Sequence, residues 1–173
     1  KSNYSSLSNR CVSSISMTSD HVVIYTDGSS RGNPGPGGYG VILKYGTHNR
    51  ELAQGFHFTT NNRMELMAVI EGLKALKKKG LHVTVYSDSQ YVVKAIKEGW
   101  LKKWITTNFK GGKKNPDLWR ELHTLLQLHH VTFKWIKGHA DNPYNNKCDE
   151  LATNAAIHGK KISDHIYERE KET

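Results

Sequence analysis

Two short apolar runs that end in nearly the same triplet constrain the fold more than any other feature of the chain. Residues 22–26 (VVIYT) precede Asp27, and residues 83–87 (VTVYS) precede Asp88. Both runs are rich in β-branched and aromatic residues, which predicts buried strands. Side chains alternate along a strand, so each tyrosine lies on the same face as the aspartate two residues later. An open α/β sheet binds ligands beyond the carboxyl ends of its strands, where both aspartates would lie.

The residues between these runs predict how the two strands pair. Residues 39–45 and 51–58 are predicted strands, and together with residues 21–27 they form an antiparallel meander. Residues 64–79 then carry apolar side chains at helical spacing until Gly80 ends the pattern. This crossover makes the strand before Asp88 parallel to the first strand.

The rest of the chain alternates helices with one more strand. We expect a short helix near 89–98, a basic irregular segment, a helix at 117–128, a strand at 131–136 and a last helix at 143–158. The predicted fold class is therefore α/β, with a mixed five-stranded sheet flanked by helices: a meander of three antiparallel strands plus two parallel strands. One domain spans residues 21–158, with a basic protrusion at about 94–116 and a C-terminal tail at 159–173.

Residues 1–20 differ from the rest. The first sixteen hold seven serines, no acid and no apolar periodicity, which predicts disorder. Met17 is placed like a natural start, so the preceding residues are an extension or a cloning remnant; an organelle-targeting remnant is the alternative. Cys11 and Cys148 form no spaced pair, which indicates a reducing compartment. We expect a cytoplasmic protein, or an organellar one if residues 1–16 are a targeting remnant.

The charge of the chain indicates the kind of partner. A formal net charge of +9 predicts a polyanionic partner, although a merely soluble basic surface has the same charge. No run approaches the roughly 18 to 20 apolar residues of a membrane helix, so a membrane role is not expected. We expect a monomer.

The glycine-rich segment 35–40 matches the dinucleotide-binding pattern G-x-G-x-x-G. That pattern needs a helix directly after it to hold a pyrophosphate, whereas residues 41–45 (VILKY) are typical of a strand. We therefore expect no nucleotide cofactor. The glycines are interpreted as a flat turn that lets a bulky ligand approach the backbone.

Two further acids are predicted to join Asp27 and Asp88. Glu65 lies in the first turn of its helix, where it either stabilises the helix dipole or points inward over a face of small residues. Asp149 has the same pattern and is predicted to face inward. Converging carboxylates repel one another unless divalent cations offset their charge, and oxygen ligands suit Mg²⁺. Zinc is less favoured, because His129 and His130 are adjacent and no tetrahedral Cys/His spacing is present.

Six motifs in order then give a resemblance to a known family. The sequence from His21 to Ile157 resembles ribonuclease H type 1 of the bacterial kind through segments 27–29 (DGS), 32–38 (GNPGPGG), 60–66 (TNNRMEL), 87–91 (SDSQY), 137–140 (KGHA) and 148–152 (CDELA). The resemblance implies a ribonuclease H-like fold. It also implies sequence-nonspecific endonucleolytic hydrolysis of the RNA strand of RNA–DNA hybrids, leaving 5′-phosphate and 3′-hydroxyl ends.

The resemblance also assigns catalytic roles. It implies two Mg²⁺ ions in the substrate complex, with Mn²⁺ able to substitute. Asp27 would bridge the two ions, Asp149 would complete the ion on the water side, and Glu65 and Asp88 would hold the ion on the leaving-group side. His139 would shuttle protons and help the product leave, because imidazole titrates near neutral pH.

Substrate contacts are implied in the same way. Amides suit the 2′-hydroxyl, which both donates and accepts hydrogen bonds. The positions matched for groove and sugar contacts are Asn33, Asn61 and Gln90, and Asn62 is a further expected contact. Thr60 and Asn115 match a pocket for a DNA phosphate, and Asn145 matches a residue that orients the attacking water. Residues 94–114 hold seven lysines and one acid, interleaved with aromatics, and are expected to bind the backbone through Trp100, Lys102, Lys103, Trp104 and Lys110. Phe58 departs from the family, where an arginine often grips a DNA phosphate.

Three other functions compete with this reading. A hybrid-binding module without catalysis would have lost a carboxylate, and none is lost. A resolvase or integrase core would lack this combination of the His139 loop and the basic protrusion. A ribonuclease H domain cut from a reverse transcriptase polyprotein fits the non-initiator Lys1, but the intact protrusion and Met17 favour a free-standing protein.

Overall fold

The structure is a computed structural model that describes residues 21–138 and 141–172. The predictions for residues 1–20 and for His139 lie outside the described residues. The described chain folds around one mixed sheet, whose strands are β1 (His21–Ser30), β2 (Gly35–Tyr45), β3 (His48–Thr59), β4 (His82–Ser87), β5 (His130–Trp135) and β6 (Lys161–Ile162).

The strand order β5-β4-β1-β2-β3-β6 confirms the predicted mixed sheet. Strands β1, β2 and β3 form the antiparallel meander, and β4 and β5 run parallel to β1. The sheet has six strands rather than the expected five, because β6 pairs in parallel with the edge of β3. A two-residue strand is too short to show alternation, so the sequence carried no signal for it.

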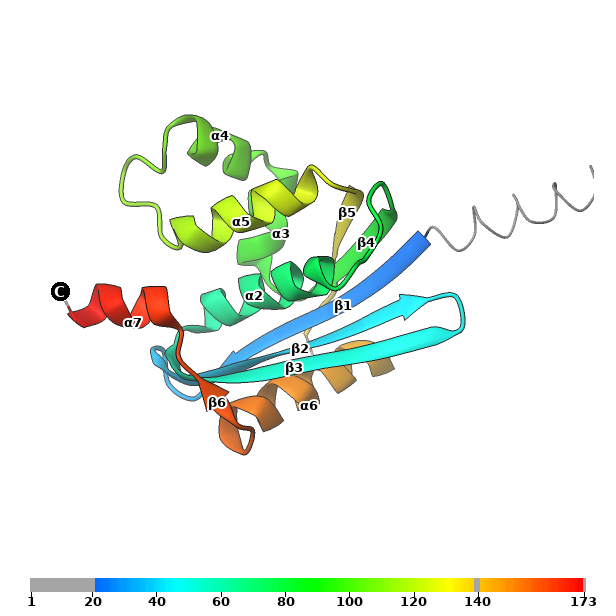
Figure 1. Ribbon diagram of the computed structural model, residues 1–173, viewed down its shortest axis with the longest axis horizontal. Coiled ribbons are helices and arrows are strands. Elements are labelled where there is room, and N and C mark those ends of the chain that lie inside the picture. The colour runs from blue at the N-terminus through cyan, green and yellow to red at the C-terminus, as the bar shows by residue number, and fades with distance from the viewer. Residues whose placement is uncertain (1–20, 139–140, 173) are drawn as a thin grey trace, which may run out of the picture.

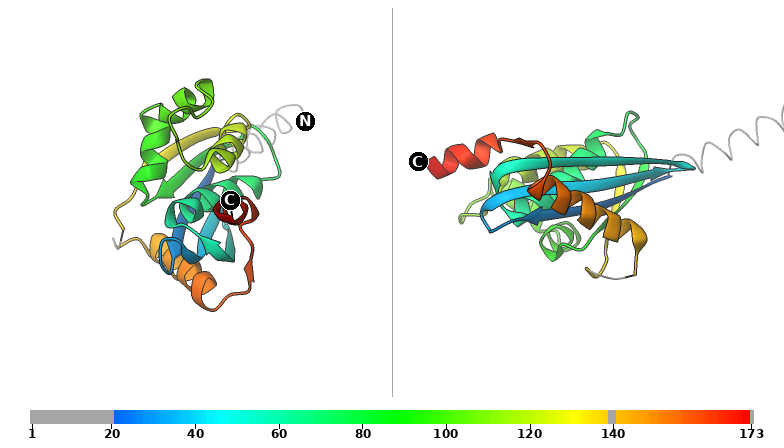
Figure 2. Two further views of the ribbon diagram at one scale, coloured as in Figure 1. Left: turned by 90° about the vertical axis from the view of Figure 1, so that its left-hand side faces the viewer. Right: turned by 90° about the horizontal axis from the view of Figure 1, so that it is seen from below.

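Helices cover both faces of this sheet (Figures 1 and 2). On one face lie α2 (Asn61–Lys74), α3 (Gln90–Lys97) and α5 (Pro116–Leu126), and on the other lies α6 (Pro143–Ile157). The core forms where α2 meets the sheet and α5, and its largest fully buried side chains include Ile24, Met64, Leu66, Ile70, Leu73, Trp119 and Leu122. Within the described residues, no helix is long and apolar enough to cross a membrane.

Helix α2 ends five residues earlier than the sequence predicted. Its last residue is Lys74, with Ala75 as the C-cap. Beyond Leu76, the lysines at 77–79 are exposed. Ala75 and Leu76 still pack against the core after the helix has ended, but the three lysines do not. The lysines therefore lack the packing on which helical structure depends.

Two helices occur where none was predicted. The basic segment contains α4 (Trp100–Thr106), which is held to the core through buried Leu101. The segment after residue 158 contains β6 and α7 (His165–Glu172), with Tyr167 and Asp164 buried. Both helices are short, so their stability comes from tertiary contacts rather than from a periodic pattern.

Candidate active site

The carboxyl ends of β1 and β4 bring the first two acids together. Strand β1 continues past Asp27 by pairing with β2, whereas its parallel pairing with β4 ends at Tyr25. Strand β4 ends at Ser87, directly before Asp88. Both aspartates therefore lie at the edge of the sheet that the sequence predicted.

A glycine lets helix α2 add Glu65 to this edge. A Cβ on Gly28 would lie 2.4 Å from the backbone nitrogen of Glu65, a distance that no side chain allows. The first turn of α2 can therefore rest on β1, and the Gly28 N–H donates a short hydrogen bond to Glu65 Oε1. Only 6% of Asp27 and 4% of Glu65 is exposed.

Glycines in β2 position helix α6 in the same way. A Cβ on Gly38 would lie 2.7 Å from the Ala152 carbonyl oxygen, and one on Gly40 would lie 2.4 Å from that of Cys148. The interpretation of this segment as a flat turn for an approaching ligand was therefore wrong. At Gly38 and Gly40 a strand packs against helix α6, because the missing side chains leave room for it.

The acids converge, but not all to the same depth. Ligand oxygens of Asp27, Glu65 and Asp88 all lie within 4.8 Å of one another. Asp149 lines the same cavity of about 360 Å³ and lies close enough to Asp27 to raise its pKa, so it faces the site as predicted, but it is exposed rather than buried. The buried face of α6 carries Cys148, Ala152 and Ala155 instead, which leaves Asp149 at the rim.

Burial and the charges of neighbouring acids raise the pKa of two members of this cluster, Asp27 and Glu65. Burial first, and then the charge of Asp88, raises the pKa of Asp27 from the usual 3.8 to about 8. Burial and the neighbouring Asp27 raise the pKa of Glu65 well above its usual value. Three carboxylates this close are stable as anions only beside a compensating positive charge.

The donor set fits a hard divalent cation. Carboxylate oxygens are the ligands that such cations prefer, and the cluster offers one from each of three residues. Asn145, which also lines the cavity, is 3% exposed, and its Oδ1 has no hydrogen-bond partner among the described residues. A buried acceptor without a partner is costly unless a bound ion, water or substrate meets it.

The raised pKa of Asp27 predicts a pH dependence of the metal-free protein. A carboxyl whose folded pKa exceeds its unfolded value binds its proton more tightly when folded. The protein then loses stability as pH rises from about 4 to about 8, by roughly a few kcal/mol. We expect the melting temperature in EDTA to fall over this range, and more steeply than in Asp27→Asn. Equal pH slopes in the two proteins would contradict the assignment.

The polar residues expected to contact substrate lie around this cluster. Asn61 lines the cavity, and its backbone N–H donates to Asn33 Oδ1 at 3.0 Å. Gln90 begins helix α3 directly after Ser89, which caps the helix and lines the cavity. Asn33, Asn61, Asn62 and Gln90 are all exposed, so their amides are accessible to a ligand.

A buried arginine that sequence reasoning missed ties the site to the rest of the molecule. Arg63 is 1% exposed, and its five guanidinium N–H groups donate to Asp164, Asp117 and Asn115 at 2.7 to 3.2 Å. Its backbone N–H also donates to Thr60, the N-cap of α2. A cation in the first turn of a helix opposes the helix dipole, which was the available signal of a special role.

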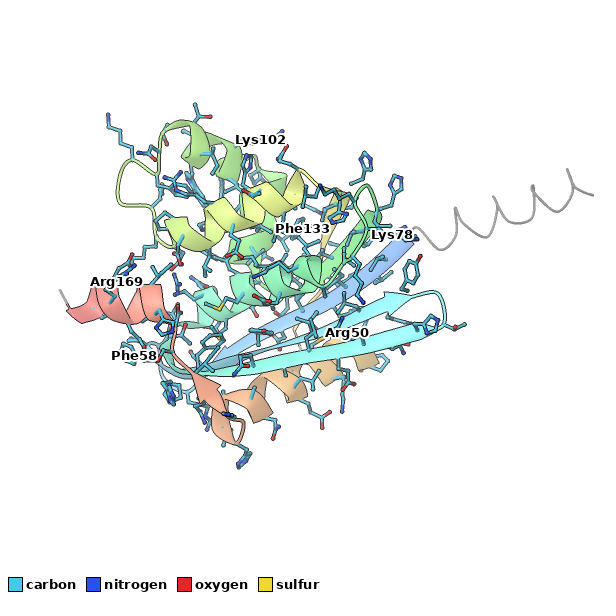
Figure 3. The ribbon with its side chains drawn as sticks, viewed as in Figure 1. Arg50, Phe58, Lys78, Lys102, Phe133 and Arg169 are labelled. Carbon is cyan, nitrogen blue, oxygen red and sulfur yellow. The ribbon has the colours of Figure 1, made fainter. Side chains whose placement is uncertain are left out.

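The region around Phe58 differs from an arginine pocket in its packing. The Phe58 ring lies against Tyr167 of α7, with ring centroids 5.7 Å apart. Figure 3 shows Phe58 near the start of this helix. Asn115 is held from two sides, because its Oδ1 accepts from Arg63 and its Nδ2 donates to the Tyr91 hydroxyl at 3.1 Å.

The basic protrusion is built on aromatic packing. Trp104 lies edge-on to the buried Trp119 at 5.4 Å, and Phe109 is buried as well. Of these aromatics, Trp100 is the exposed one, at 43%. Lys102, Lys103 and Lys110 are exposed. The segment therefore presents its lysines and Trp100 outward, while Trp104 and Phe109 support the loop.

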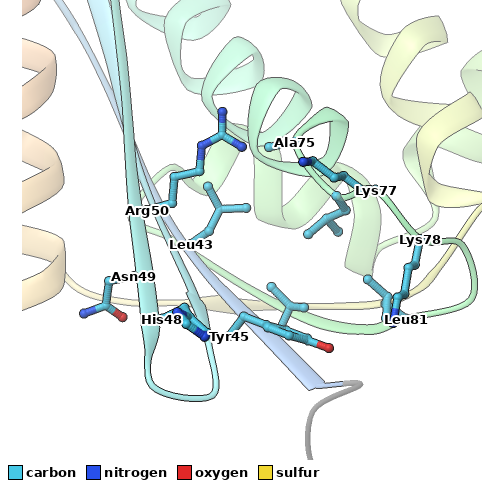
Figure 4. Close-up of a pocket in the computed structure, with 11 residues that line it drawn as sticks. Leu43, Tyr45, His48, Asn49, Arg50, Ala75, Lys77, Lys78 and Leu81 are labelled. Carbon is cyan, nitrogen blue, oxygen red and sulfur yellow. The ribbon is translucent and has the colours of Figure 1, made fainter. Parts of the chain in front are cut away.

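Another cavity, of about 330 Å³, lies at the opposite end of the sheet (Figure 4). It is formed between the β2–β3 turn and the end of α2. Its walls are mostly apolar, and basic side chains, including Arg50, Lys77 and Lys78, surround it. Its lining contains no carboxylate, so it offers no ligand for a hard cation. The candidate active site is therefore the cavity lined by the four acids.

Fold and site together define a class of α/β proteins that gather carboxylates at one sheet edge, in an arrangement that could hold a metal ion. The sequence matches the family RNase H over residues 19–157. The chain belongs to the ribonuclease H family.

Individual relatives agree with this assignment. The chain is 54% identical over 139 residues to a ribonuclease H of Desulforamulus reducens, covering 78% of this chain and 87% of the relative. It is 54% identical over 157 residues to one of Lachnoclostridium phytofermentans, covering 85% and 99%.

Solved structures show the same fold. LC9-RNase H1, described as a type 1 RNase H with the type 2 active-site motif, has a TM-score of 0.72 at 30% identity, covering 86% of this chain and 80% of its own. LC11-RNase H1 in complex with an RNA/DNA hybrid has a TM-score of 0.61 at 25% identity, covering 78% and 96%.

Proposed function

We propose that this protein is an endonuclease that hydrolyses the RNA strand of RNA–DNA hybrids, with two Mg²⁺ ions and without sequence preference. The observation that carries the proposal is the cluster of buried Asp27 and Glu65 with half-buried Asp88, whose oxygens lie within 4.8 Å of one another in a ribonuclease H fold. Membership of the ribonuclease H family supports a metal-dependent reaction on hybrids. The hard oxygen donors support Mg²⁺, with Mn²⁺ as the substitute.

The residues of the cluster would divide the work between two ions. Asp27 would be shared, Asp149 would complete the water side, and Glu65 and Asp88 would hold the leaving-group side. When bound, such a pair of ions stabilises the entering and leaving oxygens and lowers the pKa of water. The deep position of Asp27 and Glu65 supports central roles for these two acids, and the exposure of Asp149 supports a role at the rim. We propose that Asn145 orients the attacking water, since its buried Oδ1 is unpartnered among the described atoms.

Recognition of the hybrid would depend on amides beside the cluster. A protein distinguishes RNA from DNA at a given site by the 2′-hydroxyl. The linked and exposed pair Asn33 and Asn61, and Gln90 at the start of α3, offer both donors and acceptors next to the carboxylates. Because these contacts are to sugars, we propose that the protein reads the shape of the hybrid with little base preference.

One assay tests the proposed reaction. The protein is incubated with a labelled RNA–DNA hybrid, with duplex RNA and with duplex DNA, each in Mg²⁺ or in EDTA. We expect Mg²⁺-dependent loss of only the RNA strand of the hybrid, with 5′-phosphate ends on the products. Cleavage in EDTA, or cleavage of duplex DNA, would overturn the proposal.

The exposed lysines of the protrusion predict a salt dependence of hybrid binding. If about five phosphates are neutralised, affinity should fall roughly 10²- to 10³-fold between about 50 and 200 mM salt. Replacing Lys102, Lys103 and Lys110 by Gln should reduce the slope of log affinity against log salt concentration by up to about three.

A matched control for this prediction lies at the opposite end of the sheet. Lys77, Lys78 and Lys79 are exposed as well, but they lie beyond the end of α2. Replacing these three by Gln removes the same net charge and should leave the slope nearly unchanged. Equal slopes in the two triple variants would show that net charge, rather than the protrusion, binds the hybrid.

A further inference from the structure

Three histidines lie side by side across three parallel strands. In the sheet register, His21 of β1 is the Cα partner of His82 of β4, and His82 is the Cα partner of His130 of β5. Cα partners in neighbouring strands lie about 4.8 Å apart and direct their side chains to the same face of the sheet. The three residues are far apart in sequence, so local spacing gave no sign of the row.

The positions of the imidazole side chains confirm that all three histidines lie on the same face of the sheet. The imidazoles of His82 and His130 are stacked, with centroids 4.8 Å apart and an angle of 20° between their planes. His21 Nε2 lies 3.3 Å from the Oγ1 of Thr84, which is two residues from His82 and so lies on the same face. All three histidines are exposed. His129 does not join them, because it is buried and its Nδ1 accepts the Leu81 N–H.

The surface around the row is open. Helix α6 packs against β1, β2 and β3. On this face of β4, Thr84 is buried, but His82 at the start of the strand is exposed. Thr132 and Lys134, the next residues of β5 on this face, are exposed. A small ligand can therefore reach the histidines without any movement of the backbone.

We propose that His82 and His130, with His21 as a third ligand, bind a borderline transition cation of the Zn²⁺, Ni²⁺ or Cu²⁺ class. Imidazole nitrogen suits these ions, whereas Mg²⁺ prefers oxygen. Two imidazole nitrogens coordinate one ion at about 2.0 to 2.1 Å each. Partners on adjacent strands can reach that geometry by rotation of their side chains, which exchanges the ring stacking for coordination.

This site is separate from the carboxylate cluster in position and in chemistry. His21 and Asp27 lie near opposite ends of β1, and six residues of strand span about 20 Å. A cation bound to the row would cross-link β1, β4 and β5 at their amino-terminal ends. Because β5 is the edge strand of the sheet, this cross-link should stabilise the folded protein.

The test is a ZnCl₂ titration of the full chain, without an affinity tag and in excess Mg²⁺, followed by calorimetry and by the melting temperature. We expect Zn²⁺ to bind and to raise the melting temperature. In His82→Gln and in His130→Gln the affinity should fall at least roughly tenfold, because the chelating pair is broken. His21→Gln should show a smaller loss.

Two controls make the result specific. His57→Gln removes another exposed histidine, in β3, and should bind Zn²⁺ like the parent protein. Asp88→Asn weakens the carboxylate cluster and should leave this binding unchanged. The proposal is overturned if the double variant His82→Gln, His130→Gln retains the parent affinity, or if Asp88→Asn is the change that removes binding.

Discussion

Asp27→Asn is expected to abolish cleavage of the hybrid while making the metal-free protein more stable. Asp27 is buried and shares its cavity with Glu65 and Asp88. A bound cation supplies several kcal/mol of transition-state stabilisation, so loss of a shared ligand should lower kcat at least about 10³-fold. The same change removes one of three repelling carboxylates. In EDTA at pH 8 the variant should therefore unfold at a higher temperature than the parent.

Asp27→Asn is expected to lose activity but to gain stability in EDTA, and this combination makes the prediction specific. A variant that simply misfolds would lose activity and stability together. Glu51→Gln, which neutralises an exposed acid of β3, serves as the control and should change neither. The measurements are steady-state cleavage of a labelled hybrid in Mg²⁺ and thermal unfolding in EDTA. A fall in the metal-free melting temperature would contradict the repulsion argument.

Arg63→Met is expected to be the most destabilising single substitution at a charged residue. Arg63 is 1% exposed and forms ion pairs at 2.7 Å with Asp164, which is 3% exposed, and with Asp117, which is 18% exposed. Removing the guanidinium leaves these carboxylates without compensation, and breaking a buried pair costs about 3 to 5 kcal/mol. Denaturant unfolding at neutral pH measures this loss.

The chain offers a matched control for the arginine. Lys74 also bridges two acids, Glu71 at 3.4 Å and Glu121 at 3.3 Å, but it is 48% exposed. Lys74→Met should cost no more than about 1 kcal/mol, because exposed pairs are screened by solvent. Arg63→Lys should fall between the two, since an ammonium keeps the charge but not the paired hydrogen bonds. Equal losses in Arg63→Met and Lys74→Met would show that burial does not strengthen the network.

Local sequence patterns predicted much of the fold. The alternation in residues 22–26 and 83–87 and the helical spacing from Met64 onward indicated the strands, the crossover helix and the parallel pairing. Elements without a long pattern were missed. Helices α4 and α7 and strand β6 are short: α4 packs against α3 and α5, whereas β6 and α7 pack against the distant strand β3.

The sequence predicted which acids form the candidate site, but not how deeply each of them is buried. Asp27, Glu65 and Asp88 could be identified because each lies at a predicted strand end or in the first turn of a helix. The exposure of Asp149 could not be predicted from the sequence, because it depends on which face of α6 packs on Gly38 and Gly40. The ion pairs of Arg63 were equally hidden, since Asp117 and Asp164 belong to other elements.

The sequence by itself determined the order of the elements, the acids available for a cation and the basic character of the protrusion. Those properties depend on neighbouring residues, which the chain specifies directly. Only the tertiary structure decided that Glu65 rests against Gly28, that Arg63 is buried between two aspartates and that three histidines align across the sheet. These features depend on strand register and helix packing, which bring together residues that no local pattern connects.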